Sequence, residues 1–189
     1  SIHVRELPQS AARVDIGGPQ CSHPYNSSRL NISAMSFGAL SAPAVMAMNQ
    51  GAKLGGFAQD TGEGGLTPYH LKYGADVIWE IGTGYFGCRT LDGDFDADKF
   101  REKARKDEVR MIEIKLSQGA KPSHGGVLPA AKVDSEIAGI RGVPAGKDCI
   151  SPPMHKTFDS PRGLLQFVAR LRDLSGGKPT GFKLCIGRR

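Results

Sequence analysis

Long hydrophobic runs and closely spaced cysteines are both missing from this chain of 189 residues. No apolar run approaches the ~20 residues that a membrane-spanning helix needs, and no segment has the features of a secretory signal peptide. The cysteines lie too far apart in sequence to form a short metal-binding or redox motif; they are Cys21, Cys88, Cys149 and Cys185. These absences predict free thiols in a reducing, cytoplasmic compartment, with no membrane span and no metal site.

Aromatic residues are few, and acidic residues are outnumbered by basic ones. Aromatic residues make up 7% of the chain, and 19 acidic residues stand against 25 lysines and arginines. The resulting net charge of +6 suits phosphate-bearing or dicarboxylate ligands. Few aromatic residues lie between the basic ones, so nucleic-acid bases would have little to stack on. We therefore interpret the densest basic run, residues 101–106, as a solvated helix face and expect no nucleic-acid partner.

Strand-like and helix-like segments alternate along the chain. Alternating apolar and polar residues predict short strands at residues 31–37, 57–60, 76–81, 109–117 and 181–186. N-capping residues predict helices that begin at Ser41 and Ser160, and periodicity predicts further helices at residues 95–106 and 133–141. The last helix carries its apolar stripe on Leu164, Leu165, Phe167, Val168, Leu171 and Leu174.

This alternation predicts parallel βα units and therefore an α/β fold. Residues 1–29 are expected to form an extended lead-in segment, and residues 30–189 the domain itself. About five strands are expected, whereas a closed TIM (β/α)8-type barrel has eight strands and typically ~250 residues. The chain also stops at Arg189, directly after a strand. We therefore expect a TIM (β/α)8-type barrel truncated to about five βα units, with a complete open α/β sheet as the alternative.

The most informative segment is K-L-S-Q-G-A-K-P-S-H-G-G, which runs from Lys115 to Gly126. The apolar residues of the preceding strand share one face, so Lys115 points to the opposite face. Lys115, Gln118 and Lys121 thus bring two cations and an amide to the end of a buried strand, beside glycines that let a ligand approach the backbone. This set favours a small anion or a flavin, whose reduced ring gathers negative charge. The structural alternative is an ion pair of Lys115 with Glu113 or with a carboxylate of a neighbouring strand.

Three further residues are weaker candidates. Glu63 lies between glycines in T-G-E-G-G, directly after a strand, where its carboxylate would either orient an ammonium or imine group or cap a neighbouring helix. Arg141 ends a short predicted helix, where it would either grip a carboxylate with its two-pronged guanidinium or complement the helix dipole. His155 follows S-P-P-M in a loop and is expected to be incidental, as most single loop histidines are.

Six motifs follow one another along the chain: N-I-S-A-M-S-F-G-A-L-S, G-G-F-A-Q-D-T-G-E-G-G, I-W-E-I-G-T-G-Y-F-G-C-R, I-E-I-K-L-S-Q-G-A-K-P, L-P-A-A-K-V and G-G-K-P-T-G-F-K-L-C-I-G. In this order they resemble the FMN-binding (synthase) domain of glutamate synthase, and most closely the stand-alone FMN-binding glutamate synthase family proteins. The resemblance runs from about Gly17 to Arg189. It implies a TIM-barrel oxidoreductase with FMN as its cofactor.

The resemblance also implies roles for individual residues. The cofactor-binding residues would be Ala34, Met35, Ser36, Lys115, Gln118 and Lys183. Catalysis would involve Lys115, Glu63 and Lys121. The substrate would be bound by Glu63, Gln118, Lys121 and Arg141, with Lys121 and Arg141 holding its carboxylates.

The implied reaction is the addition of ammonia to 2-oxoglutarate, followed by reduction of the 2-iminoglutarate by reduced FMN to give L-glutamate. The electrons would come from a ferredoxin-like partner or from a reductase subunit. Catalysis of this reaction would make the protein an oxidoreductase that acts on CH–NH2 groups.

The chain also departs from the family pattern. Where the large enzyme resembles G-E-G-G-Q, this chain has S-H-G-G-V, so His124 and Val127 replace a carboxylate and an amide. The glycine-rich phosphate loop expected on later strands is missing from the sequence. Two alternatives therefore stay open. One is an FMN barrel with another substrate, such as a hydroxy-acid oxidase or a nucleotide-processing dehydrogenase, and the other is a non-catalytic truncated binding or assembly module.

Overall fold

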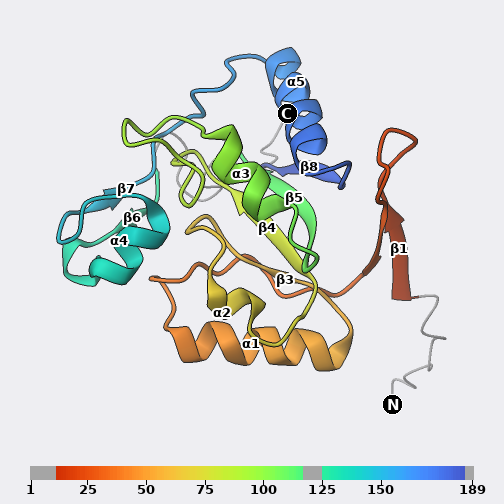
Figure 1. Ribbon diagram of the computed structural model, residues 1–189, viewed down its shortest axis with the longest axis horizontal. Coiled ribbons are helices and arrows are strands. Elements are labelled where there is room, and N and C mark those ends of the chain that lie inside the picture. Colours follow the sequence, from red (N-terminus) through yellow and green to blue (C-terminus); the bar gives the residue numbers. More distant parts are fainter. Residues whose placement is uncertain (1–11, 117–124, 186–189) are drawn as a thin grey trace.

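Four parallel strands form the central sheet of the computed structural model, which describes residues 12–116 and 125–185. Beyond the first of these strands, Ile32 adds an isolated parallel bridge to Gln59. The α/β fold class with a parallel sheet is therefore confirmed, while closure into a (β/α)8 barrel stays a prediction (Figure 1). The strand order is β3 (Gln59–Asp60), β4 (Val77–Ile81), β5 (Val109–Lys115) and β8 (Thr180–Lys183), and every neighbouring pair runs parallel.

The strand predicted at residues 31–37 is wrong beyond its beginning. Only Ile32 and Phe37 form bridges in this segment, and both bridges are isolated. Ile32 is bonded on both sides to the β3 region, because its N–H donates to Ala58 O at 2.8 Å and its oxygen accepts from Asp60 N at 3.0 Å. Since β3 is only two residues long, the ladder has no further partner, and residues 33–36 form a loop.

The helix starts predicted at Ser41 and Ser160 are confirmed, and the helices predicted from residues 95 and 133 each begin two residues later. Ser41 and Ser160 cap the first and the last helix through their side chains, as expected, and Asp96 and Asp134 cap two others. These side chains accept hydrogen bonds from N–H groups that the first helical turn leaves unpaired, which is why the starts can be predicted from local sequence. The helices are α1 (Ala42–Gly55), α2 (Pro68–Leu71), α3 (Ala97–Ala104), α4 (Ser135–Arg141) and α5 (Pro161–Leu174).

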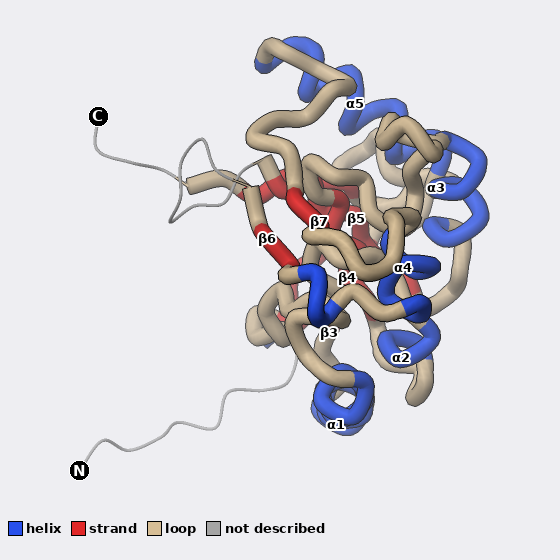
Figure 2. The backbone as a smooth tube through the Cα atoms, turned by 90° about the vertical axis from the view of Figure 1, so that its left-hand side faces the viewer, coloured by secondary structure: helices blue, strands red, loops and turns tan. Residues whose placement is uncertain are grey.

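The helices and the smaller elements surround the sheet. In Figure 1, α1 lies below β3, α3 in front of β4 and β5, and α5 beside β8. An antiparallel pair of strands, β1 (Arg13–Ile16) and β2 (Tyr25–Ser28), precedes the sheet, within the range predicted as a lead-in. A small lobe lies in front of the sheet in Figure 2. It consists of α4, the antiparallel strands β6 (Val127–Leu128) and β7 (Cys149–Ile150), and the 3-10 helix η2 (Ala130–Lys132).

The main core lies between the sheet and helices α3 and α5. Trp79 of β4 stacks on Phe100 of α3, with ring centroids 5.2 Å apart. From the stripe predicted on α5, Leu164, Phe167 and Leu171 are buried in this core. Leu165 is instead 61% exposed, because it lies about 100° around the helix from Leu164 and so faces away from the sheet.

All four cysteines are free, as predicted; Cys88 and Cys149 are buried, and Cys185 is exposed. Within the described parts of the chain, no helix combines the length and the apolar character that crossing a membrane requires.

Leu171 and Leu165 form a matched pair on one helix, at 0% and 61% exposed. We predict that Leu171→Ala lowers the free energy of unfolding by about 2–5 kcal/mol, because it removes packed methyl groups and leaves a cavity. Leu165→Ala, the control, should change it by less than about 0.5 kcal/mol. Chemical denaturation of the two variants measures both values. Equal losses of unfolding free energy in the two variants would contradict the burial of Leu171 and the exposure of Leu165.

Candidate functional site

The carboxyl ends of the parallel strands carry several of the charged residues that the sequence singled out. In folds of this kind, ligands bind in the loops beyond these ends. Lys115 ends β5 and Lys183 ends β8, and the two residues are register partners across the sheet. Like charges at paired positions repel each other, so each ammonium group needs carboxylates of its own.

Lys115 is paired with Glu63. Its Nζ lies 3.4 Å from Glu63 Oε1, and both side chains are 16% exposed. Sequence reasoning offered Glu113 or a carboxylate of a neighbouring strand as the alternative partner, but Glu113 is paired with Lys183 instead. The loop after β3 therefore reaches the end of β5 and brings together two predicted site residues that are distant in sequence.

Ser151 holds the other carboxylate oxygen of Glu63. Its Oγ donates to Glu63 Oε2 at 3.3 Å, and its N–H donates to Gly126 O at 2.8 Å. A Cβ atom at Gly82 would lie 2.9 Å from Glu63 Oε2, so a larger residue there would displace the carboxylate. Sequence reasoning did not single out Ser151. The one signal was its place before the two prolines of S-P-P-M-H, which stiffen the loop that carries it.

A cavity of about 100 Å³ adjoins this arrangement. Its volume corresponds to roughly three water molecules, which suits part of a small polar ligand rather than a large one. A guanidinium and a carboxylate both face it, so it offers opposite charges to one molecule. The lining residues are Ser36, Ala39, Glu63, Gly126, Val127, Leu128, Arg141, Cys149 and Ser151.

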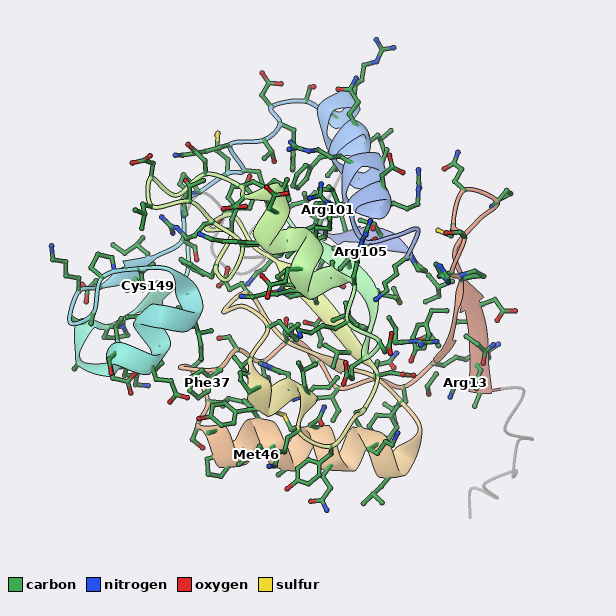
Figure 3. All side chains as sticks on the ribbon, viewed as in Figure 1. Arg13, Phe37, Met46, Arg101, Arg105 and Cys149 are labelled. Carbon is green, nitrogen blue, oxygen red and sulfur yellow. The ribbon has the colours of Figure 1, made fainter. Side chains whose placement is uncertain are left out.

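Arg141, the last residue of α4, lines this cavity and is only 5% exposed. Its Nη2 donates to Phe37 O at 3.0 Å, and its Nη1 lies 3.7 Å from Cys149 Sγ; Phe37 and Cys149 are labelled in Figure 3. Among the described residues, Nε has no hydrogen-bond partner, and no carboxylate pairs with this guanidinium. A buried cation of this kind favours the binding of an anion.

Lys183 lies among three carboxylates on the same face of the sheet. Asp60, Glu80 and Glu113 each place an oxygen within 4.8 Å of the others, a spacing that would also suit a metal ion. Lys183 Nζ donates to Glu80 Oε2 and lies 3.4 Å from Glu113 Oε2. Because this ammonium group already supplies the positive charge, we assign the carboxylates to Lys183 rather than to a metal ion.

This cluster shifts the titration of its members. Burial, together with the charges of Glu80 and Glu113, raises the pKa of Asp60 from 3.8 to about 8. Burial also raises the pKa of Glu80, although Lys183 opposes the shift. For Lys183, burial lowers the pKa, but the hydrogen bond to Glu80 and the carboxylate charges outweigh it, so its pKa is raised. At neutral pH the cluster therefore keeps Lys183 charged and Asp60 largely protonated.

The remaining predicted residues fall into two groups. Ala34, Met35 and Ser36 form a half-buried loop after Ile32. This loop touches the T-G-E-G-G turn, since a Cβ atom at Gly62 would lie 2.6 Å from Ser36 N. The second group, Gln118 and Lys121, lies outside the described residues, as does His124, which departs from the family pattern.

A larger cavity, of about 690 Å³, lies at the opposite, amino-terminal end of the sheet. Its lining is basic, with Arg105, Arg110 and Lys178 among the residues. These cations already have partners in the fold. Arg105 (Figure 3) donates to Leu174 O, Arg110 is paired with Asp76, and Lys178 donates to the oxygens of Ala104 and Lys106. We therefore assign no ligand to this cavity.

The fold and the site together define an α/β protein whose polar site lies at the carboxyl ends of parallel strands. Residues 13–189 match the family model described as the conserved region in glutamate synthase. The chain therefore belongs to the glutamate synthase family, and the resemblance seen in its motifs is confirmed.

Individual relatives are similar over most of this chain. The glutamate synthase large subunit-like protein YerD of Bacillus subtilis is 45% identical over 174 residues, which cover 91% of this chain and 33% of that protein. The archaeal glutamate synthase (NADPH) of Methanocaldococcus jannaschii is 36% identical over 151 residues, or 80% of this chain and 27% of that protein. The archaeal-type glutamate synthase (NADPH) of Thermotoga maritima is 32% identical over 152 residues, with the same shares. This chain thus spans about a third of the length of these relatives, or less.

We predict that Asp60 makes the protein less stable as the pH rises. Its pKa is about 8 in the folded protein against a usual 3.8, so the folded state binds the proton more tightly than the unfolded state. The resulting stabilisation is fully present below about pH 4 and is lost as the pH rises to about 8. Asp60→Asn removes this titration. Between about pH 5 and pH 8, the wild-type free energy of unfolding should therefore fall relative to that of the variant by at least about 1 kcal/mol.

Urea denaturation at several pH values measures this difference. Asp98→Asn serves as the control for the change from a carboxylate to an amide, because the Asp98 side chain is 88% exposed on α3. A difference between the wild type and Asp60→Asn that stays constant with pH would show that the Asp60 pKa is not raised.

Proposed function

We propose that this chain forms part of the synthase domain of an FMN-dependent, glutamate synthase-type oxidoreductase. In this proposal, ammonia adds to 2-oxoglutarate and the resulting 2-iminoglutarate is reduced to L-glutamate. The observation that carries the proposal is one small cavity at the strand ends, which is lined by the buried Arg141 and by Glu63, the ion-pair partner of Lys115. Membership of the family supports it, as do the names of relatives that are called glutamate synthases.

The charges that face the cavity match the proposed substrate. The guanidinium of Arg141 would bind a carboxylate with two parallel hydrogen bonds, for which a planar, buried donor is well suited. The carboxylate of Glu63 would accept a hydrogen bond from the imine nitrogen and complement its positive charge. Gln118 and Lys121 complete the substrate contacts in this proposal, on the strength of the family resemblance.

The residues at the strand ends fit an FMN cofactor. Lys115 and Lys183 are ion-paired cations at the ends of neighbouring strands, and the Lys183 side chain is 39% exposed, so a ligand can reach it. Ala34, Met35 and Ser36 offer a half-buried surface of small and apolar groups in the neighbouring loop. When bound, FMN would supply the electron pair for the reduction. The two lysines would favour negative charge on its ring.

The proposal extends to fold and partners. The parallel sheet would belong to a (β/α)8 barrel, of which residues 30–189 supply the first part after the lead-in of residues 1–29. The much greater length of the relatives supports this. The electrons would reach the flavin from a ferredoxin-like partner or a reductase subunit.

Anaerobic flavin reoxidation tests the proposed substrate. The full-length protein, loaded with FMN and reduced with dithionite, should be reoxidised by 2-oxoglutarate together with ammonia, and by neither compound alone. Absorbance at the flavin band follows the reaction. Reoxidation by a different acceptor alone would favour an FMN barrel with another substrate, and a protein that retains no FMN would favour the non-catalytic module.

A substitution at Lys115 tests the proposed role of the ion pair. Lys115→Met keeps the length of the side chain and removes its charge, so flavin reduction or turnover in the full-length protein should slow at least about tenfold, or ~1.4 kcal/mol in activation free energy. Lys99→Met is the control, because the Lys99 side chain is 53% exposed on α3. Stopped-flow absorbance measures both rates. Unchanged kinetics in Lys115→Met would remove Lys115 from the mechanism.

A further inference from the structure

A single loop, residues 151–157, contacts both members of the Glu63–Lys115 pair. At its beginning, Ser151 Oγ donates to Glu63 Oε2 at 3.3 Å. Further along, His155 Nε2 lies 2.8 Å from the main-chain oxygen of Lys115. Because a carbonyl oxygen only accepts hydrogen bonds, His155 carries a proton on Nε2 and donates it there.

Tyr85 anchors this loop. Its hydroxyl oxygen accepts hydrogen bonds from Lys156 N at 3.0 Å and from Thr157 N at 3.2 Å. It also lies 3.1 Å from His155 Nδ1. Burial lowers the pKa of His155, so the ring is neutral at neutral pH, and with its proton on Nε2 its Nδ1 is an acceptor. The Tyr85 hydroxyl, which also lies 3.0 Å from Thr157 Oγ1, donates to this Nδ1, and the Thr157 hydroxyl can serve as a donor to Tyr85. This arrangement fixes the tautomer that the bond to Lys115 requires.

The side chains around this anchor are tightly held. Tyr85 is 0% exposed, and its φ of 49° lies in the left-handed region that residues other than glycine seldom adopt. The ring of His155, which is 4% exposed, stacks on Phe158 with centroids 4.9 Å apart and planes 22° apart. His155 is therefore a fixed part of the structure, and the sequence-based expectation of an incidental loop histidine overlooked these contacts.

We infer that Ser151 and His155 are positioning residues that set the geometry of the Glu63–Lys115 pair. The interactions close a ring. His155 holds the main chain of Lys115, Glu63 holds the Lys115 ammonium group, and Ser151 in turn holds the Glu63 carboxylate. Since the two positioning residues belong to one short loop that Tyr85 anchors, the loop fixes both the lysine and its partner.

Two substitutions of His155 separate its hydrogen bond from its bulk. In glutamine, the side-chain amide nitrogen is separated from Cβ by the same number of bonds as Nε2 is in histidine. In asparagine, the side-chain amide nitrogen is separated from Cβ by the same number of bonds as Nδ1 is in histidine. His155→Gln should therefore keep the bond to Lys115 O, and His155→Asn should lose it. We expect His155→Asn to speed hydrogen exchange at residues 112–116 by at least about tenfold and to lower kcat by a similar factor, while His155→Gln stays within about threefold of the wild type.

Ser151 has a matched control in Ser175. Both serines are almost fully buried, at 3% and 2% exposed, and both hydroxyls donate a hydrogen bond, but Ser175 Oγ donates to Arg172 O at the end of α5. Ser151→Ala should lower kcat by at least about fivefold and speed hydrogen exchange at residues 61–65, with a smaller change in KM. Ser175→Ala should leave kcat, KM and exchange at residues 61–65 unchanged.

The measurements use the full-length protein loaded with FMN. The kinetic readout depends on the proposed function, whereas hydrogen exchange does not. If 2-oxoglutarate and ammonia give no turnover but exchange separates Asn from Gln at position 155, the positioning role stands and the proposed function fails. If His155→Asn matches His155→Gln in exchange, or Ser151→Ala matches Ser175→Ala, the positioning inference is overturned for that residue, whatever the substrate.

Discussion

Lys115 and Lys183 are register partners at the ends of neighbouring strands, and the repulsion between their charges constrains the whole site. The two ammonium groups are neutralised from different directions. Lys183 is paired with two carboxylates on the strands, Glu80 and Glu113. Lys115 is paired with Glu63, which lies in a loop. One positive charge is thus fixed within the sheet. The positive charge of Lys115 depends on the Glu63 carboxylate, which is held in place by the hydrogen bond from Ser151 in a second loop.

The features predicted well from sequence are those decided by a few neighbouring residues. The starts of α1 and α5 follow from Ser41 and Ser160, each of which bonds to an N–H group within the next turn. The alternation in β5 follows from its own side chains, and it correctly gives the buried face to Ile112 and Ile114. Such signals need no knowledge of which other segment packs nearby. The order of elements, and with it the α/β class, could therefore be predicted.

The features that sequence reasoning missed depend on contacts between distant segments. The strand expected at residues 31–37 fails because its partner β3 is two residues long. The partner of Lys115 depends on where the loop after β3 goes, and nothing near Glu63 in sequence specifies that. Ser151 and His155 acquire their contacts only when the loop before α5 meets the ends of β3 and β5. Motif resemblance identified the family but not these contacts.

Tyr85 combines two requirements that no single replacement meets. Its backbone conformation suits glycine, whereas its hydroxyl serves the N–H groups of Lys156 and Thr157 from the end of a buried ring. Glycine would relieve the backbone and leave those donors unpaired, and phenylalanine would keep the ring and lose the acceptor. Each of these two replacements therefore keeps one requirement and loses the other, so the conformation of the loop that carries His155 depends on a tyrosine at this position.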